Sequence, residues 1–231
     1  MKKWILLIMA VCLVLTGCGK SEQGSEANTE QSSTAAAEQG NEAPAEQEEA
    51  RTISPLPDST MENLTDAILS VSLEEGGAYV DDTGKMQMDL KIYTYDRYDQ
   101  VDIAGLKEGD TIVTHGGEVK VTSLNRAESG FLSVNGGQEE GGFDLMTDDS
   151  GVYFEIGFND VKNWYQIGEA TIRVSADFTG LDNADPDAGE IVLYPGSFLV
   201  GEVTNYDFTP YNTTVRVEAG QIVEMNRVFA P

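Results

Sequence analysis

The chain has 231 residues and a formal net charge of −26, because 40 acidic side chains outnumber 14 basic ones. A field of this sign repels phosphate backbones, so nucleic acid is not expected as a partner. The two cysteines, Cys12 and Cys18, lie at the extreme N-terminus, so iron–sulfur clusters and zinc–thiolate sites are excluded from the rest of the chain. The only histidine is His115, so multi-histidine metal sites are excluded as well.

The N-terminus has the pattern of an export signal. An unbroken apolar run of twelve residues, Trp4–Leu15, follows a short basic start, Met1–Lys3. This length suits the hydrophobic region of a secretory signal and falls short of the roughly 20 residues of a membrane-spanning helix. The tetrapeptide LTGC at positions 15–18 then resembles the lipobox of bacterial lipoprotein signals.

The resemblance covers residues 1–20 only, and it implies a lipid anchor. It implies that the sulfur of Cys18 takes a diacylglyceryl group, that the chain is cut after Gly17, and that Cys18 becomes the acylated mature N-terminus. Two or more acyl chains anchor a protein stably. We therefore expect residues 1–17 to be a signal peptide and the mature protein to be held at the extracytoplasmic face of the cell membrane.

Residues 18–52 differ in composition from the rest of the chain. They are rich in Glu, Gln, Ser, Ala and Gly, and they contain no aromatic or large aliphatic residue. Such a segment buries nothing that could offset its chain entropy. Several glutamates recur at four-residue spacing, and like charges at that spacing oppose a helix. We expect a disordered acidic tether with a reach on the order of 30 Å.

Residues 53–231 have the length of one domain with a sizeable core, and we recognise no family for them. In Met86–Ile92 apolar residues alternate with polar ones, and 170–176 repeats the alternation. This period of two is typical of half-buried antiparallel strands. A capping-box pattern predicts a turn or short helix at 60–65, followed by a strand to Leu73. We predict an all-β domain of nine to eleven strands, a single antiparallel β-sandwich or barrel-like domain.

Turn motifs separate the predicted strands. Chain reversals are expected at DDTGK (81–85), Gly116-Gly117 and EAGQ (218–221). The stretch LKEGDTI (106–112) is similar to a turn found in many small β-domains. In that turn Gly109 would take the bend and the carboxylate of Asp110 would accept backbone N–H groups.

Few residues suit catalysis. No nucleophile motif such as G-x-S-x-G accompanies His115, so we expect an exposed turn residue with no catalytic part. We expect the aspartates around Arg97, among them Asp96, to pair with it at a solvated edge. Of the adjacent Trp164 and Tyr165, one should enter the core and the other should lie outward, where it could stack on a sugar.

An acidic loop offers a candidate calcium site. Asp182, Asp185 and Asp187 lie within six residues of sequence. Residues 53–231 contain 32 acidic and 10 basic residues, so few cations are available to neutralise this loop. Calcium binds carboxylate oxygens on a bent backbone, but the EF-hand spacing is absent, because Ala188 stands where that pattern needs glycine. A cation that closes the loop and an open, solvated turn both remain possible. No motif for an organic cofactor is present.

These features predict a lipid-anchored cell-surface protein with a non-catalytic binding module for an unknown protein or glycan. The alternative is a carboxylate-based hydrolase that acts on glycans, because the many acids offer many carboxylate pairs. A deep cleft with two close carboxylates, one with a raised pKa, would favour the hydrolase. A convex acidic surface would favour the binding module.

Overall fold

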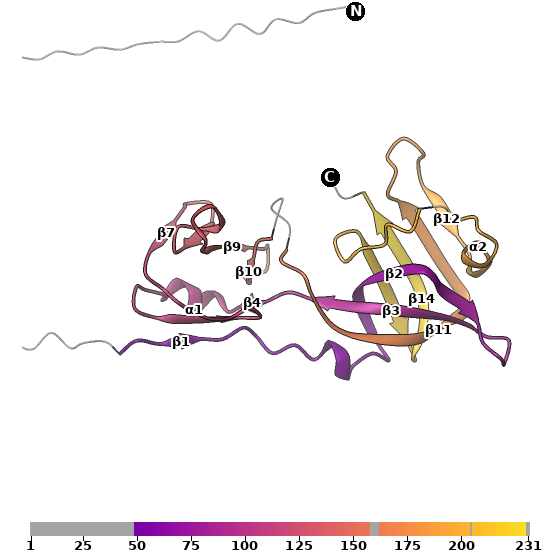
Figure 1. Cartoon of the computed structure of the whole chain (residues 1–231), viewed down its shortest axis with the longest axis horizontal. Helices are drawn as coiled ribbons and strands as arrows, with labels where there is room; N and C mark the ends of the chain where they lie inside the picture. The colour runs from indigo at the N-terminus through magenta and orange to yellow at the C-terminus, as the bar shows by residue number, and fades with distance from the viewer. Residues whose placement is uncertain (1–48, 158–161, 204, 230–231) are drawn as a thin grey trace, which may run out of the picture. The chain divides into compact units, whose positions relative to one another are not determined.

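The computed structural model describes residues 49–157, 162–203 and 205–229. The predicted signal peptide, Cys18 and the tether as far as residue 48 lie outside the described residues. Inside them the protein is all-β, which confirms the predicted fold class (Figure 1). No helix in this part of the chain has the length and apolar character that crossing a bilayer requires.

The described residues form fourteen strands in three sheets. The six-stranded sheet contains β2 (Ala67–Val80), β3 (Met86–Thr94), β11 (Tyr165–Asn183), β12 (Ile191–Leu193), β13 (Thr213–Glu218) and β14 (Gln221–Val228). The five-stranded sheet contains β4 (Arg97–Tyr98), β7 (Leu124–Arg126), β8 (Leu132–Val134), β9 (Phe143–Thr147) and β10 (Tyr153–Glu155). The third sheet contains β1 (Thr52–Ile53), β5 (Thr111–Thr114) and β6 (Gly117–Lys120). More strands are found than were predicted because several are only two or three residues long.

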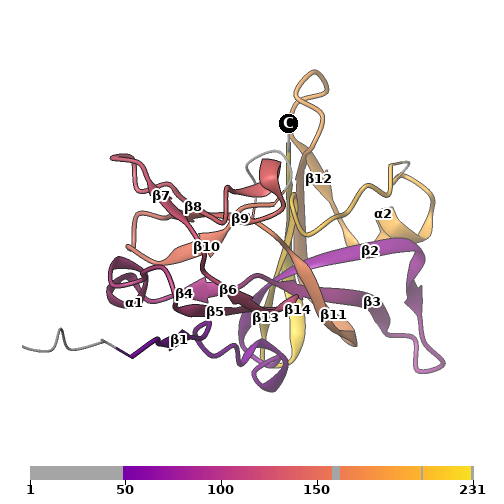
Figure 2. The same ribbon diagram turned by 60° about the vertical axis from the view of Figure 1, so that its left-hand side comes forward.

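Strand pairing in the largest sheet passes around five strands. The 19-residue β11 pairs antiparallel with β3 along its first half and parallel with β14 along its second half. β2 pairs with both β3 and β13, and β13 pairs with β14. In chain order the five strands are neighbours as 1-2-3-5-4-1, which is the strand order of the OB-fold. The remaining strand, β12, pairs with β11 at the edge of the sheet (Figure 2).

Two hydrophobic cores lie in the domain. The larger one is lined by the six-stranded sheet, and the alternating Met86, Met88, Leu90 and Ile92 all point into it, as their spacing predicts. The smaller core gathers residues of the two other sheets and helix α1 (Gln100–Ala104), including Ile103 and Ile112. The parallel pairs β1–β5 and β11–β14 depart from a purely antiparallel arrangement. The two smaller sheets lie outside the ring of five strands, so no single closed barrel includes all strands of the domain.

The helices are short. Among the residues that the structure describes they are η1 (Thr60–Glu62), α1, η2 (Gln138–Glu140) and α2 (Pro195–Leu199). The helix expected at 60–65 is thus a single 3-10 turn. The strand expected to end at Leu73 instead continues to Val80, because an irregularity lets the chain resume pairing at Ala78, opposite Met88. At this irregularity Gly77 lies so close to its neighbours that a Cβ there would stand 2.9 Å from a methyl carbon of Leu73.

The predicted turns are present. Residues 81–85 join β2 to β3, Gly116 lies in the turn from β5 to β6, and 219–220 join β13 to β14. In the turn before β5, Gly109 has a φ of 92°. The fully buried carboxylate of Asp110 accepts the backbone N–H groups of Lys107 and Arg51, as that turn motif predicts for its aspartate. The contact with Arg51 and the pairing of Thr52 place the last residues of the predicted tether within the fold.

Candidate functional site

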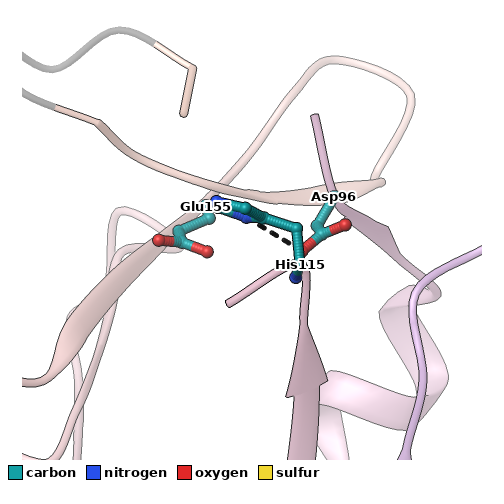
Figure 3. A group of neighbouring side chains, drawn as sticks. All are labelled: Asp96, His115 and Glu155. Atoms are coloured by element: carbon teal, nitrogen blue, oxygen red, sulfur yellow. Dashed lines mark hydrogen bonds and ion pairs between the residues drawn. The ribbon is translucent and has the colours of Figure 1, made fainter. Parts of the chain in front are cut away.

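Three side chains with metal-ligand or acid–base chemistry converge from distant parts of the sequence. Asp96 lies between β3 and β4, His115 follows β5, and Glu155 ends β10. One donor atom of each lies within 4.8 Å of the other two (Figure 3). We call these three residues the Asp–His–Glu cluster. In the chain, β4, α1 and β5 separate Asp96 from His115, and β6 to β9 with η2 lie between His115 and β10, so folding alone brings the three residues together.

Asp96 is the buried member of the cluster. Its side chain is 3% exposed, and its Oδ2 accepts the backbone N–H of His115 at 2.6 Å. The same oxygen lies 3.6 Å from Nδ1 of the imidazole, while Oδ1 accepts the hydroxyl of Tyr165 at 2.9 Å. The expectation that Asp96 would pair with Arg97 at a solvated edge is therefore wrong. Asp96 lies next to strand β4, whose Tyr98 is fully buried, and this position places the aspartate inside the domain.

Glu155 has an incomplete hydrogen-bond set. Its Oε1 accepts the side-chain amide of Asn163 at 2.7 Å. Its Oε2 is buried and has no hydrogen-bond partner among the residues that the structure describes. Burial raises the pKa of Glu155 and the negative charge of Asp96 adds to the rise, although the hydrogen bond from Asn163 and the proximity of His115 oppose it.

The imidazole of His115 is held on one face. Its ring stacks on that of Tyr165 with centroids 4.4 Å apart and planes 14° from parallel, and its side chain is 33% exposed. Burial, together with the hydrogen bond to Asp96, raises the pKa of Tyr165. His115 lies beside the turn as expected, but it is not a bare surface residue. The carboxylate of Asp96 lies beside the imidazole, a neighbour that the sequence pattern does not reveal.

Trp164 and Tyr165 are both half-buried, so the expected division into one core and one outward ring is wrong. Trp164 packs edge-on against Tyr95, with centroids 4.8 Å apart. Nζ of Lys162 lies 4.3 Å from the centroid of the Tyr95 ring and donates to its hydroxyl at 2.8 Å. This lysine is thus engaged by aromatic rings.

The acidic loop is arranged differently from the cluster. Arg227 binds Asp182 through both carboxylate oxygens, with Nε donating to Oδ1 at 2.9 Å and Nη2 donating to Oδ2. Burial alone would raise the pKa of Asp182, but these bonds outweigh it and hold the pKa below its usual value. Oδ1 of Asp185 accepts the backbone N–H groups of Asp187 and Ala188. A calcium ion at this loop would share Asp182 with Arg227, and the calcium site stays a prediction.

A polar groove lies on the solvent side of the six-stranded sheet. Its volume is about 470 Å³, and residues of β2, β3 and β11 line it. Oδ1 of Asp89 accepts the hydroxyls of Thr171, at 2.6 Å, and of Tyr79, at 3.4 Å. Lys91 and Glu74 form an ion pair within it. The irregularity of β2 contributes Glu74, Glu75 and Gly77 to its wall.

The comparisons with known proteins assign no family to the chain. No protein-family model, no curated protein and no solved structure matches the chain. The geometry and charge of the groove and of the Asp–His–Glu cluster are therefore what points to a function.

Proposed function

We propose that the chain is a lipid-anchored protein of the extracytoplasmic membrane face, whose β-domain binds a glycan without transforming it. The observation that carries the binding function is the polar groove on β2, β3 and β11. It is open to solvent and lined by hydroxyl, carboxylate and ammonium groups. Ligand sites in proteins are concave regions with a few such groups in fixed positions.

The groove chemistry favours a ligand rich in hydroxyls. Asp89, Thr171 and Ser72 offer side-chain acceptors and donors that can exchange their present partners for sugar hydroxyls. Tyr79 is 37% exposed and provides a ring against which an apolar sugar face can pack. Glu74, Glu75 and Glu169 make the rim acidic, so neutral or amino-bearing glycans are favoured over anionic ones.

The strand order supports the same surface. OB-folds bind oligonucleotides or oligosaccharides on the face of their second and third strands, here β3 and the first half of β11. The domain charge disfavours oligonucleotides, which leaves oligosaccharides.

The Asp–His–Glu cluster favours a second candidate, a carboxylate-based glycan hydrolase. Asp96 and Glu155 are close together and the pKa of Glu155 is raised, as a general acid requires. However, Asp96 is almost completely buried, and both of its oxygens are engaged by Tyr165 and His115. An engaged carboxylate without access to a sugar is a poor nucleophile or base. Binding is therefore the function that we propose first.

A glycan array tests the binding function. The full chain, purified in detergent, should bind neutral or amino-sugar glycans, and Tyr79→Ala should weaken binding about tenfold, which corresponds to about 1.4 kcal/mol. Tyr211→Ala is the matched control, because Tyr211 is 50% exposed and lies outside the groove. Absence of glycan binding, or equal losses in the two variants, would contradict the proposal. Release of shortened glycan by wild type but not by Glu155→Gln would support the hydrolase instead.

Metabolic labelling with a fatty acid tests the anchor. The Cys18→Ser precursor should take up no label and should lose its membrane association. Cys12→Ser is the matched control, because Cys12 lies within the proposed signal peptide and should be removed with it. Equal membrane partition of Cys18→Ser and wild type would contradict the lipid anchor.

A further inference from the structure

The Asp–His–Glu cluster has a donor set that neither glycan binding nor lipid anchoring uses. One imidazole and two carboxylates, contributed by separate strands and turns, approach one another within a single small volume. We infer that Asp96, His115 and Glu155 form a binding site for one divalent transition-metal ion of the zinc type. This site is additional to the proposed glycan groove and does not depend on it.

The donor spacing is close to what such an ion needs. Ligands that lie about 2.1 Å from a tetrahedral zinc ion are about 3.4 Å from one another. Nδ1 of His115 and Oδ2 of Asp96 are already 3.6 Å apart. All three donors lie within 4.8 Å of one another, so a movement of at most about 1.4 Å brings the carboxylate of Glu155 to the spacing that the ion needs.

The unpaired oxygen of Glu155 is an independent indication of a ligand. A buried carboxylate oxygen without a donor costs about 1–3 kcal/mol. Oε2 of Glu155 is in this situation among the described residues, next to a second carboxylate, Asp96. Those residues provide no Lys or Arg ion pair to either group. A divalent cation would supply the missing partner and cancel both negative charges.

Outer hydrogen bonds hold the proposed ligands in place. Tyr165 donates to Oδ1 of Asp96, and Asn163 donates to Oε1 of Glu155. Oε2 of Glu155 has no hydrogen-bond partner among the described residues, and Oδ2 of Asp96, which accepts the backbone N–H of His115, keeps a second lone pair for an ion. The stacked ring of Tyr165 restricts the imidazole of His115. Partners of this kind orient metal ligands and raise affinity about 10- to 100-fold.

The ligand types select the class of ion. Imidazole suits zinc and other first-row transition ions, whereas calcium prefers six to eight oxygen ligands. Three protein ligands leave at least one position open to water on the exposed side of His115. Ion binding at this cluster should therefore favour zinc over calcium, in contrast to the predicted site at the acidic loop.

Zinc binding to the full chain, purified in detergent without a histidine tag and stripped with EDTA, tests the inference. Titration against a chromophoric chelator should give one zinc per chain. Zinc at a concentration a hundredfold above its Kd should raise Tm by about 5 °C or more. Calcium at the same concentration should leave Tm unchanged. His115→Ala and Glu155→Gln should each weaken zinc binding at least tenfold. Their Tm without metal reports whether they fold.

Matched controls decide the location of the ion. The double variant Asp185→Asn, Asp187→Asn removes two acids far along the chain from the cluster and should bind zinc like wild type. Loss of cobalt(II) absorption bands in His115→Ala would confirm imidazole ligation by a readout that does not depend on stability. Wild type with no zinc binding below 1 mM, or unchanged affinity in both cluster variants, would overturn the inference.

Discussion

Two buried carboxylate sites of this domain differ in their partners: among the described residues Arg227 pairs with Asp182, whereas no Lys or Arg forms an ion pair with Asp96 or Glu155. Asp182 is bound through both oxygens by Arg227. Asp96 and Glu155 instead receive a backbone N–H, a hydroxyl and an amide, with His115 beside them. In a chain with so large a surplus of acid, an exposed carboxylate is hydrated by water, but a buried one needs its own partner. Asp182 is therefore neutralised by the protein itself, whereas Asp96 and Glu155 are suited to neutralisation by an external ion.

The largest effect is expected from Arg227→Met. This change leaves Asp182 buried without its cation and also removes the bond from Nη1 to the carbonyl oxygen of Asn205. Breaking one side of a buried ion pair costs about 3–5 kcal/mol of unfolding free energy, which urea denaturation can measure. Arg216→Met is the matched control. Arg216 is 42% exposed and pairs with Glu218 and Glu224, so its loss should cost less than about 1 kcal/mol.

The same pair predicts an acid limit to stability. The pKa of Asp182 is lowered in the folded state, so its stabilising contribution is present at neutral pH and is lost as the pH falls through the lowered value. The double variant Arg227→Met, Asp182→Leu should recover much of the loss, because it leaves no unpaired charge. Equally small losses of unfolding free energy in Arg227→Met and Arg216→Met would contradict a stabilising role of the buried Asp182–Arg227 pair.

An intermediate effect of opposite sign is expected from Glu155→Gln. In EDTA at pH 7 this variant should be more stable than wild type by about 1 kcal/mol, because it removes an underpaired buried charge beside Asp96. The pKa of Glu155 is raised on folding, so wild type is stabilised by protonation as the pH falls. The advantage of the variant should be complete above the raised pKa and should vanish below the usual glutamate value.

Urea denaturation at pH 7 and at pH 4 measures this effect. Glu224→Gln is the control, since the hydrogen bond from Arg216 lowers the pKa of Glu224 and its replacement should not stabilise. Destabilisation by Glu155→Gln in EDTA at pH 7 would mean that the ionised carboxylate already has an adequate partner without metal.

The smallest effect is expected at the acidic loop. Asp185 and Asp187 are exposed, and asparagine can accept the same backbone N–H groups as Asp185, so the double asparagine variant should change the unfolding free energy by less than about 0.5 kcal/mol. If the loop binds calcium, millimolar calcium should raise Tm of wild type and not of the variant, at matched ionic strength. Equal shifts in both would leave only charge screening.

The sequence was most informative where a local rule operates. Alternation placed Met88 and Leu90 in the core, and glycines in turn motifs placed the reversals near Gly109 and Gly220. Pairings between distant strands were beyond such rules. The strand after Leu73 was missed because its glycines and glutamates disfavour a strand, and pairing with β3 overrides that preference.

The Asp–His–Glu cluster could not be predicted for a different reason. Its members lie at or near the ends of separate strands with no fixed spacing in the sequence, and two of them are among the 32 acids of residues 53–231. The acidic loop attracted the prediction because its aspartates are adjacent in sequence. Residues that are adjacent in sequence allow turns to be predicted. A candidate metal site is recognised by the burial of its charged groups, and this burial is known only from the folded structure.

The attachment of β1 has a mechanical consequence. If Cys18 carries the proposed lipid, any pull between membrane and ligand enters the domain at Arg51. There the chain is fastened by a bond from its N–H to the buried Asp110 and by one from the Thr111 N–H to its carbonyl, before two residues of parallel pairing with β5. This short clip would be the first part to yield under load. Its detachment would lengthen the tether. The six-stranded sheet, which is connected to β1 only through later residues, would stay folded and would keep its groove.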